Sequence, residues 1–208
     1  MKQKFRMLLL MAVFTFMLSA AYGAEPKLTD EEKAEFSERI KQKIEDFQSY
    51  LSIINSKESL SSTVNAAVKN GLKLFIGSGE SYYTTDAYGN RITNAPVEIQ
   101  VSSKNGRIRS QSVKSYLQGI AGKLNKMYSQ VKITSSEAVR VDNIHETGDG
   151  RYECVAYFFQ KFEGYRDGRL VYTDVTTKKV RVYLEQIEGP VGKTWSIALG
   201  DISVVEKK

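Results

Sequence analysis

Residues 152–162, YECVAYFFQKF, are apolar on both faces at their centre, which is the pattern of a strand that has neighbours on both sides. Turn signals rich in glycine flank this stretch, TGDG at 147–150 and EGYRDG at 163–168. A long strand region follows at 170–184, with a bend expected near Thr176. The stretch therefore predicts that the last third of the chain is a sheet of antiparallel strands.

The end of the chain continues this sheet. Trp195, Ile197 and Leu199 alternate onto one face of a last strand. Ile202 faces the same way as Leu199 only if Gly200 marks a β-bulge, because the extra residue of a bulge shifts the alternation by one position. Shorter alternating runs predict further strands at 97–101, 131–133 and 139–141.

The first half of the chain has the period of helices. Thr29 and Glu32 form a capping box, in which each side chain bonds the other residue's amide. Apolar residues then recur at steps of three and four along one long helix that ends near Asn55. These residues are Phe36, Ile40, Ile44, Phe47, Leu51 and Ile54. Ser56 is placed to cap a second helix, and Gly71 to end it in the left-handed conformation.

A polar segment separates the second helix from the third. A short apolar strand is expected at 72–76, and residues 77–95 then have no helical period, so we expect an exposed loop or lid. The tyrosines of this loop either recognise a partner or pack against the parent domain, and both interpretations stay open. They are Tyr82, Tyr83 and Tyr88. A third helix is predicted at 113–124, with Tyr116 beside its apolar face.

Together these elements predict an α+β fold with three helices packed on one strongly curved antiparallel sheet. The element order over about 30–205, with the ending TWSIALGDI at 194–202, resembles the NTF2-like superfamily, also called cystatin-like or SnoaL-like. The resemblance implies a cone with a partly apolar pocket between helices and sheet. The superfamily includes enzymes such as ketosteroid isomerase and scytalone dehydratase, and also many members that only bind or dimerise, so the fold does not specify the function.

Residues 1–23 have the pattern of a signal peptide. Three basic residues precede an apolar run at 7–18, and Ala21-Tyr22-Gly23 offers a cleavage site of small residues. The run is too short to span a membrane. There is no cysteine near the cleavage site, so we do not expect a lipoprotein. We therefore expect one domain at 24–208, exported to the periplasm or outside the cell, without an integral membrane segment.

Composition narrows the classes of partner. The whole chain has 30 Lys and Arg against 24 Asp and Glu, a net charge of +6, and removal of the signal peptide leaves +3. This small excess, interspersed with acids, does not indicate a nucleic-acid-binding protein. One cysteine and one histidine allow neither an internal disulfide nor a Cys/His zinc site within a monomer. We expect no metal and no cofactor.

Three local motifs have more ordinary interpretations. Gly189-Pro190-Val191-Gly192-Lys193-Thr194 has two residues between its glycines instead of the four of a phosphate-binding loop, so it predicts a hairpin turn. His145 approaches a turn and is expected in solvent. Cys154 lies within a strand without a neighbouring base, and we expect a buried, inert thiol.

The candidate ligand site lies between the third helix and the sheet. If the strand at 170–184 has no bulge, Asp174 shares parity with Val180 and Val182 and points inward. An inward carboxylate could act as a general base, whereas a bulge at 173–177 would turn it outward. The predicted lining is Tyr116, Cys154, Phe158, Tyr172, Asp174 and Trp195, with the 77–95 loop near the mouth.

We expect an exported binding or interaction protein rather than an enzyme. Its partner would be a small apolar ligand or another protein, and a homodimer through the sheet is a further arrangement. The first alternative is a small isomerase, dehydratase or hydrolase that uses Asp174. The second is a structural subunit of a cell-envelope assembly. An open cavity with a buried acid beside a tyrosine would favour the enzyme, a dry apolar pocket the binder, and a filled cone the assembly role.

Overall fold

The structure is a computed structural model that describes residues 27–86, 88–102, 107–124, 127–135, 138–147, 150–189 and 192–207. The signal peptide expected at 1–23 lies outside the described residues. So does the turn signal at 105–106. The chain divides into two units, Met1–Glu32 and Lys33–Lys208.

The predicted capping box is confirmed in the first unit. The amide of Thr29 donates to Glu32 Oε2 at 2.8 Å, and the amide of Glu32 donates to Thr29 Oγ1 at 3.2 Å. Both bonds satisfy amides that the first helical turn leaves without partners. Helix α2, Asp30–Asn55, begins directly after this Thr.

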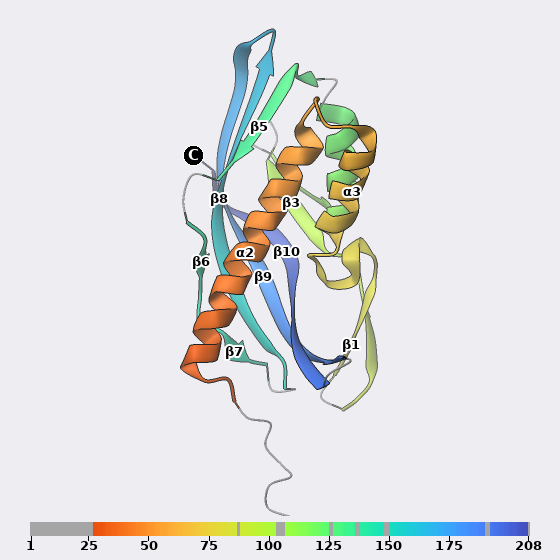
Figure 1. Ribbon diagram of the computed structural model, residues 1–208, viewed down its shortest axis with the longest axis vertical. Coiled ribbons are helices and arrows are strands. Elements are labelled where there is room, and N and C mark those ends of the chain that lie inside the picture. Colours follow the sequence, from red (N-terminus) through yellow and green to blue (C-terminus); the bar gives the residue numbers. More distant parts are fainter. Residues whose placement is uncertain are drawn as a thin grey trace, which may run out of the picture. The chain divides into compact units, whose positions relative to one another are not determined.

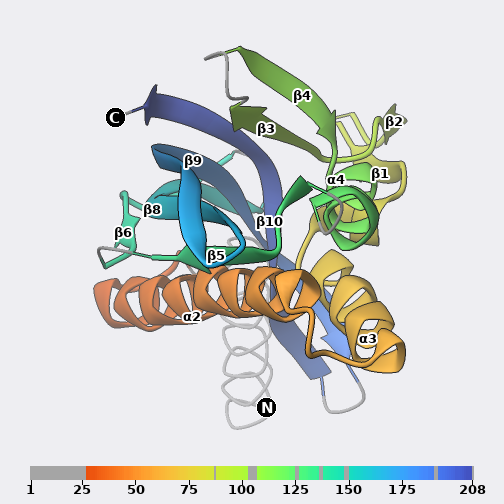
Figure 2. The same cartoon turned by 90° about the horizontal axis from the view of Figure 1, so that it is seen from above.

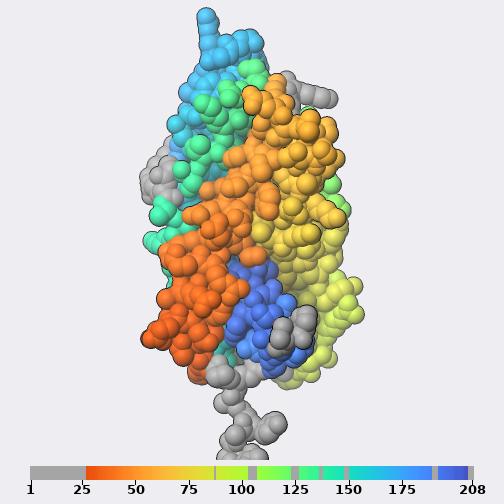
Figure 3. Space-filling model, viewed as in Figure 1, coloured from red at the N-terminus to blue at the C-terminus, as the bar shows by residue number. Residues whose placement is uncertain are grey.

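In the second unit, α2 presents the predicted apolar stripe to the sheet. Every stripe residue from Phe36 to Ile54 is buried. Phe36 contacts Trp195 edge to face at 5.6 Å between ring centroids, and Phe47 meets Phe75 in the same way at 5.2 Å. Figures 1 and 2 show α2 beside α3, Ser61–Leu72. In Figures 1 and 3 the hairpin of β8, Tyr152–Arg166, and β9, Arg169–Gly189, extends past the upper end of α2.

Helix α3 begins and ends differently from the prediction. Leu60 is its N-cap and no side chain caps it, so the expected cap at Ser56 is wrong. Gly71 lies inside the helix rather than after it. A Cβ at Gly71 would lie 3.3 Å from Leu117 Cδ1 and 3.6 Å from Tyr50 Cβ. This glycine therefore allows close helix packing instead of ending the helix.

The main sheet has eight strands in the order β4-β3-β10-β9-β8-β5, with β6 and β7 also paired to β8. Their bounds are β3 Glu98–Ser102, β4 Ile108–Ser112, β5 Gln130–Thr134, β6 Arg140–Val141, β7 His145–Glu146, β8 Tyr152–Arg166, β9 Arg169–Gly189 and β10 Gly192–Lys207. Strand β10 pairs with β3 in parallel, at Ile202 and Ile99. The sheet is therefore mixed, which corrects the all-antiparallel prediction, and it is not strongly curled. The α+β class, with three α-helices among the described residues, is confirmed.

The long strands follow the sequence pattern closely. Strand β8 is a central strand, as predicted, with β9 on one side and β5, β6 and β7 on the other. The turn into β9 is tighter than the expected 163–168: Arg166 pairs with Arg169, and Asp167 and Gly168 have φ of 52° and 76°, a two-residue hairpin turn. The ladder runs through Thr176 without a register shift. The predicted bulge at Gly200 is confirmed by a register shift between Leu199 and Ile202.

Residues 77–95, expected to be a loop, contain a hairpin. Strand β1, Tyr82–Thr85, pairs with β2, Arg91–Asn94, in a separate two-stranded sheet. The 3-10 turn η1, Ile76–Gly79, precedes it. The two strands are short and mostly polar, so alternation could not reveal them. The strand expected at 72–76 reduces to one bridge between Phe75 and Leu199. No helix among the described residues is long and apolar enough to cross a membrane.

The bulge glycine gives a test of this packing. A Cβ at Gly200 would lie 2.6 Å from Tyr183 Cε2 and 3.3 Å from the carbonyl oxygen of Arg181. We expect Gly200→Ala to lower the free energy of unfolding by about 1–3 kcal/mol, because the Tyr183 ring and the backbone at Arg181 must shift to admit the methyl group. The measurement is urea unfolding. The control is Gly122→Ala, since a Cβ at Gly122 meets nothing within 4 Å; equal losses in both variants would contradict the account.

Candidate functional site

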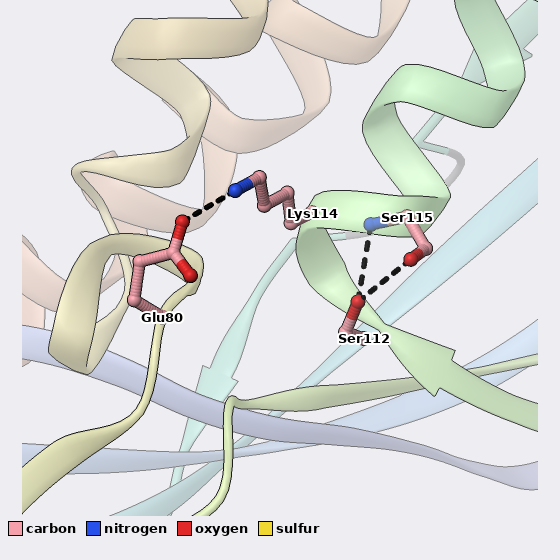
Figure 4. A network of polar contacts seen from close by, with 4 residues as sticks. All are labelled: Glu80, Ser112, Lys114 and Ser115. Atoms are coloured by element: carbon pink, nitrogen blue, oxygen red, sulfur yellow. Dashed lines mark hydrogen bonds and ion pairs between the residues drawn. The ribbon is translucent and has the colours of Figure 1, made fainter.

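Helix α4, Val113–Gly119, forms one wall of the site and is fixed at its start. Ser112 is the N-cap, and its Oγ accepts the amide of Ser115 at 3.1 Å. Lys114 forms an ion pair with Glu80, just after η1 (Figure 4). Val113 and Leu117 are fully buried in the core. The helix continues as a π-helical turn, η2, Ile120–Leu124, so the predicted third helix is present with a change of winding near its end.

A cavity of about 530 Å³ lies between α4–η2 and the sheet. Residues of β3, β4, β5, β8 and β9 complete its walls. The apolar part of the lining is Val101, Ile120, Met127, Ile133 and Phe162. This volume lies within the range of small-molecule sites, about 300–1,000 Å³.

A row of polar side chains from β9 crosses the cavity wall. Asp174, Thr176 and Lys178 alternate onto the same face of the strand and are only 8%, 4% and 3% exposed. Gln160 of β8, which pairs with Thr176, is 7% exposed. All four line the cavity. Burying polar and charged groups costs free energy unless they are paired. The row therefore differs in its energetics from the rest of this face of β9, which is apolar as far as Leu184.

Asp174 points inward, as the alternation predicts. No register shift interrupts β9 between Asp174 and Val182, so the outward alternative, which needs a bulge, is wrong. Ser102 Oγ of β3 donates to Asp174 Oδ2. The ring of Tyr172, two residues earlier on the same face, lies 5.7 Å from that of Phe162. The cavity therefore holds an acid close to a tyrosine.

Lys178 lies near the middle of β9 among largely apolar groups. Its Nζ donates to the carbonyl oxygen of Gln100 at 3.4 Å and stands 6.0 Å from the ring centroid of Tyr116. Burial lowers the pKa of Lys178 to about 8, although the carboxylate of Asp174 acts in the opposite direction. Burial also raises the pKa of the Tyr116 phenol. At neutral pH the ammonium is therefore still mainly charged, in a poorly solvated place.

The structure brings three of the predicted lining residues together, Tyr116, Tyr172 and Asp174. Cys154 and Phe158 lie in the closed core instead, 1% and 0% exposed, and neither lines the cavity. Burial raises the pKa of the Cys154 thiol to about 12, which agrees with an inert thiol.

Trp195 is the third residue that was wrongly predicted to line the cavity. Its ring packs between those of Phe36 and Tyr152, with 5.6 Å between ring centroids in each pair. The alternation identified the inward face correctly. It did not show that α2 covers that face at one end of the sheet, while α4 stands over the cavity at the other.

Lys178, Gln160, Thr176 and Ser102 were missed by the sequence prediction. Lys178 and Thr176 share the parity of Asp174, so their inward direction was visible in the same pattern. Gln160 shares the parity of Phe158 on the neighbouring strand. The signal was thus present, as charged and polar residues on the buried face of a long strand.

The other motifs take no part in this cavity. His145 is exposed, with Nε2 3.4 Å from Glu153 Oε1. Gly189 pairs with Gly192 across the β9–β10 hairpin, which confirms the turn. Among the described residues, no three His, Cys, Asp or Glu side chains gather as a metal site would require.

Comparisons with protein-family models and with curated proteins found no match to this chain. The chemistry of the cavity is therefore what bears on function.

The buried ammonium predicts a pH dependence of stability. Between about pH 8 and 10.5 the unfolded chain keeps the Lys178 proton that the folded chain has released, so stability gains with rising pH. At 1.36 kcal/mol per pKa unit the gain is about 3 kcal/mol. Lys178→Met lacks this gain, and chemical unfolding at pH 7 and 10.5 measures it as a difference from the unaltered protein. Lys179 is exposed on the other face of the strand, so Lys179→Met should retain the gain in stability. Loss of the gain in Lys179→Met, or its persistence in Lys178→Met, would contradict the burial argument.

Proposed function

We propose that the protein binds a small, partly apolar molecule in the cavity between α4 and the sheet. The observation that carries this proposal is the cavity itself, about 530 Å³ with apolar side chains along much of its wall and buried polar groups on β9. A few polar groups in an otherwise apolar site orient a ligand and give it specificity. The tyrosines Tyr116 and Tyr172 add contact area with little loss of conformational entropy.

A physical cost supports a functional origin of this site. Burying Asp174 and Lys178 adds a desolvation penalty that an apolar pair of similar size would avoid. This cost falls on side chains that line the cavity, which favours selection for binding over packing alone. The open volume also weighs against the assembly role, which the sequence associated with a filled interior.

The position of the cavity supports a second element of the proposal, kinship with the NTF2-like superfamily. The resemblance implies a pocket between helices and sheet, and the cavity lies between α4–η2 and five strands. We propose the kinship from this position and from the order of elements.

The binding proposal is tested by filling the cavity from one glycine. Gly119 lines the cavity, and a Cβ there meets nothing within 4 Å. We expect the uncharged dye N-phenyl-1-naphthylamine to bind the unaltered protein with increased emission. In Gly119→Trp the affinity should fall by about 10-fold or more, because the indole takes the dye's space.

The matched control is Gly122→Trp, three residues further along. Gly122 is exposed, a Cβ there also meets nothing within 4 Å, and the residue does not line the cavity. This variant should bind the dye like the unaltered protein. Absence of dye binding, or equal binding in Gly119→Trp, would refute the proposal.

A second candidate function, the enzyme, is favoured by Asp174. The buried acid beside Tyr172 in an open cavity is the arrangement that the sequence analysis associates with an enzyme. An inward acid that accepts from Ser102 and lies beside Tyr172 is an arrangement that could remove a proton from a bound carbonyl compound. The enzyme alternative predicts that the protein accelerates deuterium exchange of 2-decanone at its α-carbon in D2O, and that Asp174→Asn reduces the acceleration by about 100-fold.

The binding proposal predicts no acceleration over buffer in the same NMR measurement. Asp142→Asn is the control, because Asp142 lies outside the cavity and is partly exposed. Exchange that requires Asp174 and not Asp142 would establish the enzyme in place of the binder.

A further inference from the structure

Two side-chain donors in the buried part of the cavity, on Lys178 and Gln160, are poorly matched by acceptors of the described residues. The ammonium of Lys178 carries three N–H groups, and the acceptor within hydrogen-bond distance among the described residues is Gln100 O, at a long 3.4 Å. Gln160 Nε2 is also buried and has no partner within the described part of the chain. Both side chains line the cavity. Unmet buried donors of this kind cost free energy that a ligand acceptor would recover.

These two donors lie close together on the sheet. Lys178 pairs with Phe158, and Gln160 pairs with Thr176, across the β8–β9 ladder. They are therefore diagonal neighbours on one face, a relation that long side chains can bridge. A single acceptor group with two oxygens matches this pair.

The charged side chains of the lining also favour a negatively charged ligand. Lys178 and Arg109 are positive and Asp174 is negative. Asp174 Oδ2 already accepts from Ser102 Oγ, whereas the buried ammonium has the one long contact to Gln100. A monoanion would balance the lining charge, while a dianion such as a phosphate monoester would place an uncompensated charge near Asp174.

From these observations we propose that the cavity is a carboxylate site: it takes a small organic acid whose carboxylate accepts from Lys178 Nζ and Gln160 Nε2. The apolar body of the acid lies against side chains such as Ile120 and Phe162. This inference rests on the proposed binding function and adds the chemical class of the ligand.

The experiment is displacement of the bound dye by decanoate and by decanamide, its uncharged counterpart. At pH 7 we expect decanoate to displace the dye at a concentration about 10-fold lower or better, since a hydrogen bond to a charged group is the stronger kind. Lys178→Met should remove this preference, and Lys179→Met should keep it. Asp174→Asn should strengthen decanoate relative to decanamide, because the competing negative charge is gone.

The pH profile of the unaltered protein tests the same inference without a substitution. A carboxylate ligand stabilises the charged form of Lys178, so the preference should be nearly constant from about pH 6 to 7. It should then decline through about pH 8, as the free ammonium loses its proton. Displacement by decanamide should not change over this range.

The failures of the two proposals are distinguishable. Equal displacement by decanoate and decanamide, a preference that survives in Lys178→Met, or a preference that persists unchanged to pH 10 would overturn the carboxylate site. The binding proposal would stand in each case, provided that Gly119→Trp still blocks the dye. If the dye binding does not depend on Gly119, both proposals fall.

Discussion

The pairing of β9 with β8 determines which side chains of β9 enter the core and which enter the site. From Tyr172 to Leu184 the ladder has no register shift, so every second residue of β9 faces the interior. One half of that face is apolar and is covered by α2. The other half carries Asp174, Thr176 and Lys178 and faces the cavity under α4. A shift of one residue would exchange the two faces of the strand, and with them the core and the site.

The same alternation explains why the site is costly. Lys178 is nearly as buried as the valines that follow it, but an ammonium cannot recover its hydration from Gln100 O and a tyrosine ring alone. The depressed pKa expresses this cost. An apolar residue would relieve it, as would a bound anion. The presence of open volume beside the ammonium is what distinguishes a site from an ordinary buried charge.

The sequence predicted what depends on local periodicity. The capping box at Thr29, the stripe of α2, the bulge at Gly200 and the inward direction of Asp174 all follow from spacing within one element. The parallel pairing of β3 with β10 and the packing role of Gly71 depend on residues far apart in the chain, and no local pattern encodes them. For the site, the alternation along β9 predicted which side chains point inward. The position of the helices decides where that inward face is closed and where it is open.

Lys178 is a buried cation beside an open cavity, and the titration of its 13Cε resonance tests this by a single measurement. The resonance can be assigned by its absence in Lys178→Met. We expect a midpoint near pH 8 in the free protein and a higher midpoint with decanoate bound, because the anion stabilises the ammonium. A midpoint near 10.5, the value of an unperturbed lysine, would show that the side chain is solvated and would contradict the account.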